Sequence, residues 1–119
     1  FPSLLKVLER LRDLLPAVGA DGEEPLFNVL GRYNGRSWRL VIFPRRKHRP
    51  DVYFLGEKDR MLITPGAFEM SGLIVVPREK DYSRITKASA LRILREVGSP
   101  PGTTARIAAC LSESFPAGR

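Results

Sequence analysis

The sequence has very few of the residues on which common catalytic and metal sites are built. Its 119 residues include a single cysteine, Cys110, and a single histidine, His48. One thiol cannot form an internal disulfide, and these two residues do not supply the ligand spacing of a zinc site. We therefore expect no catalytic residue, no metal site and no bound cofactor in this chain. The lone thiol also favours a reducing compartment, and we expect the cytoplasm.

Long apolar runs are missing as well. No stretch approaches the roughly 18 consecutive apolar residues of a membrane span, so we expect no membrane association. Charges at Lys6, Glu9 and Arg10 interrupt the first residues, which is not typical of a secretory signal. The sequence also has no Gly-x-x-x-x-Gly-Lys-Ser/Thr loop and no Gly-x-Gly-x-x-Gly. The familiar glycine-rich loops that bind phosphate are therefore excluded.

Positive charge is abundant, and it is concentrated in one short segment. The net charge is +7. Between positions 32 and 49 there are seven basic residues and no acidic one: Arg32, Arg36, Arg39, Arg45, Arg46, Lys47 and Arg49. The rest of the chain carries equal numbers of acidic and basic residues. A concentration of one sign attracts anions, either phosphate groups or a polynucleotide.

The basic segment begins within a predicted β-hairpin. Residues 26–33 and 36–43 have the composition of strands, and Asn34-Gly35 between them is the favoured pair for a two-residue type I′ turn. That turn predicts a register in which Tyr33 faces Arg36, Gly31 faces Trp38, Val29 faces Leu40 and Phe27 faces Ile42. This face is apolar, and the opposite face carries Arg32 and Arg39.

The remaining pattern predicts one α+β domain over residues 1–119. We expect an N-terminal helix over 1–16, a sheet region over 26–77 and a helical C-terminal region over 78–111. Further short strands are predicted at 52–55, 61–64 and 73–76, and Thr86 is a good N-cap for a helix. The architecture is therefore an antiparallel sheet built around the Asn-Gly hairpin, with helices packed to one side.

The candidate site is the loop after the hairpin, between Pro44 and Pro50. It contains Arg45, Arg46, Lys47, His48 and Arg49, which we call the basic loop. Arginine pairs with phosphate oxygens in a bidentate way and lysine adds a point charge, so the loop is predicted to bind phosphate or another anion. Arg39 and Glu69 are supporting candidates, and Glu69 is expected to pair with an arginine of the loop. A basic loop that only faces solvent is the alternative interpretation.

Three stretches together resemble a known family. They are Leu26 to Leu30, Phe43 to Asp51 and Ala67 to Tyr82, where Glu-Met-Ser-Gly to Asp-Tyr is the most specific part. They are similar to the C-terminal part of GDP-L-galactose phosphorylase-like proteins and of a related, uncharacterised bacterial family. Both belong to the histidine-triad superfamily, with galactose-1-phosphate uridylyltransferase and the diadenosine tetraphosphate phosphorylases. The resemblance implies that the α+β fold is one half of a histidine-triad-like structure.

The resemblance also implies an activity for a longer protein. In such nucleotidyltransferases and phosphorylases, a histidine of a His-x-His motif attacks the α-phosphate of a nucleotide. This sequence contains no His-x-His. We therefore expect a C-terminal module that is inactive alone, that meets an N-terminal half of the same protein, and that contacts a nucleotide or nucleotide-sugar phosphate. The alternatives are a small nucleic-acid-binding module and a non-catalytic packing domain that forms a homodimer.

Overall fold

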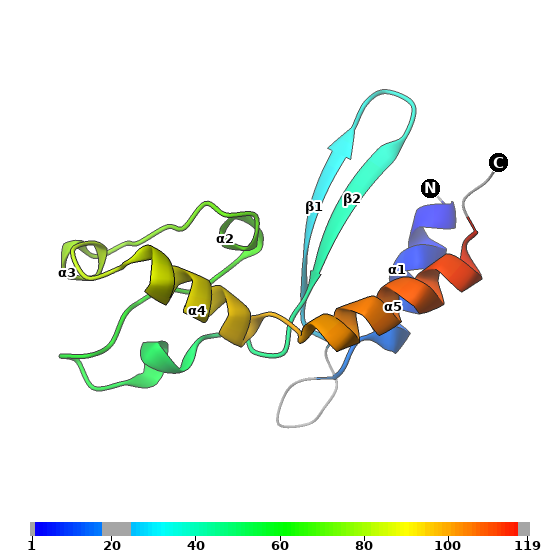
Figure 1. The fold of residues 1–119 in the computed structure, drawn as a ribbon. Helices are drawn as coiled ribbons and strands as arrows, with labels where there is room; N and C mark the ends of the chain where they lie inside the picture. The colour runs from blue at the N-terminus through cyan, green and yellow to red at the C-terminus, as the bar shows by residue number, and fades with distance from the viewer. Residues whose placement is uncertain (1, 18–24, 117–119) are drawn as a thin grey trace.

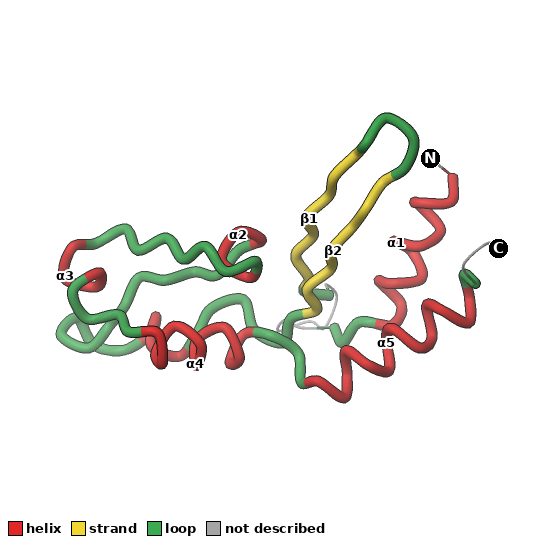
Figure 2. Tube along the Cα trace, turned by 45° about the horizontal axis from the view of Figure 1, so that its top comes forward, coloured by secondary structure: helices red, strands yellow, loops and turns green. Residues whose placement is uncertain are grey.

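Helices from the two ends of the sequence pack side by side. The computed structural model describes residues 2–17 and 25–116. Helix α1 (Pro2–Leu14) lies along helix α5 (Pro101–Ser114) in both views (Figure 1, Figure 2). Leucines at helical spacing give α1 one apolar face, as the sequence predicts. Leu11 and Leu15 bury this face against Ile107 of α5, and each such side chain contributes about 2 kcal/mol.

The hairpin rises from the base of this helix pair. Strands β1 (Phe27–Tyr33) and β2 (Trp38–Pro44) form a two-stranded antiparallel sheet that projects from the middle of the molecule (Figure 1). At its base, Phe27 and Ile42 pack against the α1–α5 cluster. Toward its tip the side chains become exposed. The α+β class predicted from the sequence is confirmed, and the hairpin is its centre.

The predicted register is wrong by two residues. Tyr33 pairs with Trp38, Gly31 with Leu40, Val29 with Ile42 and Phe27 with Pro44. The loop therefore has four residues, and the Asn34 side chain accepts hydrogen bonds from the Arg36 and Ser37 amides. A type I′ turn needs positive φ at both central positions, but only Gly35 has it, with φ +92°. A shift of two keeps each side chain on its predicted face, so the faces are correct.

A second apolar cluster lies on the other side of the hairpin. Met61, Ile63 and Ile93 form its buried part, and Ile74 and Val76 pack against it. The strands predicted at 52–55, 61–64 and 73–76 are wrong. Residues Asp51–Phe54 form a 3-10 helix, η1, and the other two segments have no regular secondary structure. In 73–76 exposed and partly buried residues still alternate, but no neighbouring strand pairs with the segment in the described structure.

Three further helices lie in this part of the chain, and one of them supplies Ile93 to the second cluster. Helix α2 (Ala67–Met70) and helix α3 (Glu79–Tyr82) are single turns, and helix α4 (Lys87–Val97) is the longest of the three. Thr86 caps α4 as predicted, because its Oγ1 accepts a hydrogen bond from the Ser89 amide at 3.1 Å. Gly98 follows the last turn. In any other residue at position 98, the Cβ would lie only 3.1 Å from the Leu94 carbonyl oxygen, so the position favours glycine.

The molecule is elongated, with two separate apolar clusters. Its Cα radius of gyration is 16.6 Å, whereas about 13.5 Å is typical of a compact chain of this length. Residues 44–47 connect the two parts, because the Arg45 amide donates to the Leu26 carbonyl and the Arg46 and Lys47 amides donate to the Val97 carbonyl. The basic loop therefore lies at the junction. In the described ranges, every helix is too short or too polar to cross a bilayer.

Candidate functional site

Arg45 is the member of the basic loop that the fold buries. Only 4% of its surface is exposed. Its Nη1 donates to Asn28 Oδ1 at 3.0 Å and its Nη2 donates to the His48 carbonyl at 2.7 Å. Burial lowers the pKa of the guanidinium, and the charge of Glu69 opposes that shift. These contacts link β1 to the loop. Arg45 therefore stabilises the conformation of the loop backbone, and its guanidinium is not part of the exposed surface of the site.

The next two cations are anchored to the end of α4. Arg46 Nε donates to the Glu96 carbonyl at 2.8 Å, and the residue remains exposed. Lys47 Nζ donates to Asp51 Oδ1 at 2.7 Å and to Glu96 Oε1 at 2.9 Å. These hydrogen bonds raise the pKa of Lys47, and the bond from Lys47 lowers the pKa of Asp51. The charge of Lys47 is therefore already paired with two carboxylates, those of Asp51 and Glu96.

The basic loop lines a pocket of about 370 Å³. Its walls are Arg46, Lys47, His48, Arg49, Asp51 and Phe54. His48 is exposed, and the Arg49 guanidinium carbon lies 4.5 Å from the centre of the Tyr53 ring. A cation over an aromatic face is held in place without losing its charge. The structure thus brings together four of the five loop residues predicted from the sequence, and leaves Arg45 behind them.

Glu69 has a structural role in α2. Its Oε2 accepts a hydrogen bond from the Gly66 amide at 2.8 Å, which satisfies a free donor at the start of the helix. The predicted ion pair with an arginine of the loop is absent at 4 Å among the described residues, and the influence of Glu69 on Arg45 is through its charge alone. Arg39 lies on the hairpin, outside the loop pocket.

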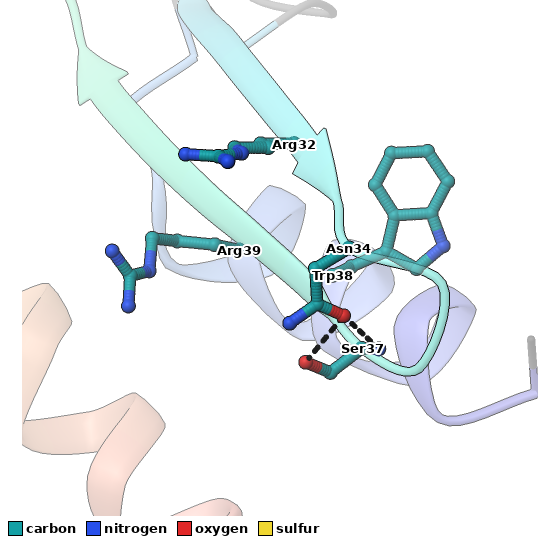
Figure 3. A pocket seen from close by; sticks show the side chains of 5 residues that line it. All are labelled: Arg32, Asn34, Ser37, Trp38 and Arg39. Carbon is teal, nitrogen blue, oxygen red and sulfur yellow. Dashed lines mark hydrogen bonds between the residues drawn. The ribbon is translucent and has the colours of Figure 1, made fainter.

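The hairpin has its own pocket, which the sequence analysis missed. A hollow of about 360 Å³ is lined by Arg32, Asn34, Ser37, Trp38 and Arg39 (Figure 3). Arg32 and Arg39 are directly paired across the two strands. With the predicted register Arg32 would have faced Ser37, and the pairing of the two arginines was hidden. A hairpin loop of four residues, in place of the predicted two, would have predicted the pairing of Arg32 with Arg39.

The opposite face of the hairpin tip is aromatic. Tyr33 and Trp38 are neighbours across the strands, with ring centroids 5.2 Å apart, and they remain 52% and 47% exposed. Gly31 lies beside them, where a Cβ would be 3.2 Å from Leu40 Cδ2 and 3.5 Å from the Trp38 ring. They line a cavity of about 610 Å³ with Arg36 and residues of α1. The rings lie on the face that the sequence predicts to be apolar, and about half of each remains exposed.

The described residues contain no group of three or more histidine, cysteine or acidic side chains that could hold a metal ion. Fold and surface together define a small α+β module with two clusters of cationic side chains, one on the loop and one on the hairpin. The chain belongs to the family described as GDPGP1-like, C-terminal domain, whose model matches residues 20–113. The comparison with curated proteins found no match, and neither did the comparison with solved structures.

Proposed function

We propose that this chain is the C-terminal module of a phosphorylase-like protein and that its basic loop binds a phosphate group of a nucleotide or nucleotide sugar. The family supports the first part of the proposal. The observation that supports the second part is the loop pocket, where Arg46, His48 and Arg49 stand around one hollow. Guanidinium groups are the side chains best suited to phosphate oxygens.

The surface of the module supports a role within a larger assembly. Its accessible surface is 8631 Å², against about 6,500 Å² for a compact monomer of this mass. Exposed apolar side chains account for part of the excess, among them Leu73, Val75 and Phe68. Cover by an N-terminal half of a histidine-triad-like protein, which would hold the His-x-His motif, is the arrangement that we propose. A homodimer would cover the same kind of surface.

Titration with GDP, ADP and a nucleotide sugar tests the loop. Arg46→Gln combined with Arg49→Gln removes two charges from the pocket while the buried Arg45 stays in place. Arg10→Gln combined with Arg106→Gln is the matched control, because both are exposed helical arginines away from the pocket. We expect the loop variant alone to weaken binding, by about tenfold for each lost charge-assisted bond. Equal affinities of the two double variants would remove the loop from the proposal.

Binding of single-stranded nucleic acid is a second candidate, and one observation favours it. The exposed Tyr33–Trp38 pair at the hairpin tip offers aromatic faces on which bases stack, and Arg36 lines the same cavity. A gel shift with an oligonucleotide at two salt concentrations separates the candidates. Micromolar affinity that falls steeply with salt and is lost with Trp38→Ala would favour the nucleic acid.

A further inference from the structure

We infer that Arg32, Arg39 and Asn34 form a second anion site, on the hairpin, for a compact phosphate anion such as a phosphate monoester or a diphosphate. This site is separate from the pocket of the basic loop. Its side chains come from the two strands and the turn, and they lie on one face of the hairpin (Figure 3). Residues at positions 45–49 do not line it.

The first argument for this site is the charge of the arginine pair. Arg32 and Arg39 are direct cross-strand partners, and the Cβ atoms of such partners lie about 5 Å apart. Like charges in this position repel one another, and neither guanidinium has a carboxylate within 4 Å among residues 2–17 and 25–116. An anion between the two groups would replace that repulsion by two charge-assisted interactions.

Asn34 provides a third donor, and its orientation is fixed. Its Oδ1 accepts from the Arg36 amide at 3.0 Å, from the Ser37 amide at 2.8 Å and from the Ser37 hydroxyl at 3.4 Å. The oxygen is therefore committed to the turn, and the amide nitrogen is left as a donor on the side where the arginines lie (Figure 3). Among the described residues, no acidic side chain lines the hollow, so its polar wall is suited to an anion.

The positions of the other cations favour a compact ligand over a polymer. Arg36 lines the cavity on the opposite face, Arg45 is buried, and Lys47 is paired with two carboxylates. A polynucleotide backbone needs a continuous track of cations, and these side chains do not extend one from the arginine pair. Two adjacent guanidinium forks instead match the closely spaced negative charges of one phosphate or diphosphate group.

Trp38 provides the measurement, because it is the only tryptophan of the sequence and directly precedes Arg39, with its ring on the opposite face of the hairpin tip. We would titrate the full chain with sodium pyrophosphate at low ionic strength and follow the fluorescence of Trp38. The test variant is Arg32→Gln with Arg39→Gln, and the charge-matched control is Arg10→Gln with Arg106→Gln. The expected result is a saturable signal that weakens about tenfold or more in the test variant and less than about twofold in the control.

Further comparisons show whether the fluorescence signal comes from the hairpin site. Arg46→Gln with Arg49→Gln should leave the Trp38 response to pyrophosphate unchanged, so the hairpin site and the loop pocket succeed or fail independently. Equal weakening in test and control variants would reduce the effect to net charge and overturn the site. Tighter binding of an oligonucleotide than of pyrophosphate, lost in the same test variant, would overturn the assignment to a compact phosphate anion.

Discussion

Arg78 grips the buried carboxylate of Asp81 with two hydrogen bonds, from Nε to Oδ2 at 2.9 Å and from Nη2 to Oδ1 at 3.2 Å. Oδ2 also accepts from the Leu62 amide at 2.9 Å, and Arg78 reaches Glu57 and the Arg60 carbonyl. One buried acid thus organises the loop at 57–62, which has no regular secondary structure to support it. Met61 of this loop belongs to the second apolar cluster.

Asp81→Asn is expected to destabilise the fold. The amide retains the shape of the carboxylate but removes the buried one of the two acids that Arg78 pairs with, so that only Glu57 remains, and it places an NH₂ group beside a donor. We expect the free energy of unfolding to fall by about 2 kcal/mol, measured by urea denaturation. Asp59→Asn is the control, since Asp59 is exposed and makes no side-chain bond within the described residues. Equal losses in both variants would contradict the role given to Asp81.

Stability should also fall in acid. Burial alone would raise the pKa of Asp81, but the hydrogen bonds from Arg78 and Leu62 outweigh it and the pKa lies below its usual value. Hydrogen bonding to Lys80 likewise lowers the pKa of Glu57. As pH decreases, the unfolded chain binds these protons first, so the stabilisation is complete above about pH 4 and is lost below it. Urea titrations between pH 7 and pH 3 measure this loss, and the Asp81→Asn variant should show a smaller slope.

Two glycines near the α4–α5 junction should respond to alanine with opposite signs. At Gly98 a Cβ would lie 3.1 Å from the Leu94 carbonyl oxygen and 3.6 Å from Met70 Cε, so Gly98→Ala should cost about 1 kcal/mol. At Gly102, inside α5, a Cβ meets nothing within 4 Å. Gly102→Ala should therefore stabilise the protein by about 0.5 kcal/mol, because alanine favours the helix. The midpoint of thermal unfolding should therefore be lower in the Gly98→Ala variant and higher in the Gly102→Ala variant than in the unmodified chain.

Relief of the cross-strand repulsion should be visible without any ligand. Arg39→Gln leaves Arg32 without a like-charged partner, so we expect a higher midpoint of thermal unfolding at low ionic strength. The gain should shrink toward zero at about 1 M salt, where the screening length is near 3 Å. Arg36→Gln serves as the comparison, since Arg36 has no cross-strand arginine. A gain that does not depend on salt would show a cause other than repulsion.

The hairpin shows which features of the fold the local sequence determines and which it does not. Alternation and Asn34-Gly35 located both strands and assigned each side chain to its face. The register depended on whether Asn34 would adopt positive φ, and it does not, because its side chain instead accepts hydrogen bonds from the turn. Residues 73–76 show the other limit. Their continuous run of apolar, mostly β-branched residues is typical of a buried strand, but a strand also needs a neighbour, and no local signal reports one.

The same division applies to the candidate site. Pro44 and Pro50 delimit the loop, and four of its predicted residues do share one pocket. The burial of Arg45 could not be predicted, since it depends on Asn28 in β1 and on the packing of the loop against Val97. Arg32 and Arg39 become a pair only through the true register. The phosphate-binding role of either cluster stays a prediction for the titrations above.

The elongated shape has a calorimetric consequence. A chain that spreads its apolar residues over two small clusters shields less hydrocarbon from water than one with a single core, and the heat capacity increment of unfolding follows that shielded area. The increment should therefore lie below the roughly 1.5 kcal/mol/K typical of a compact chain of this length. A shallow dependence of stability on temperature would follow, with a broad melting peak in a scanning experiment.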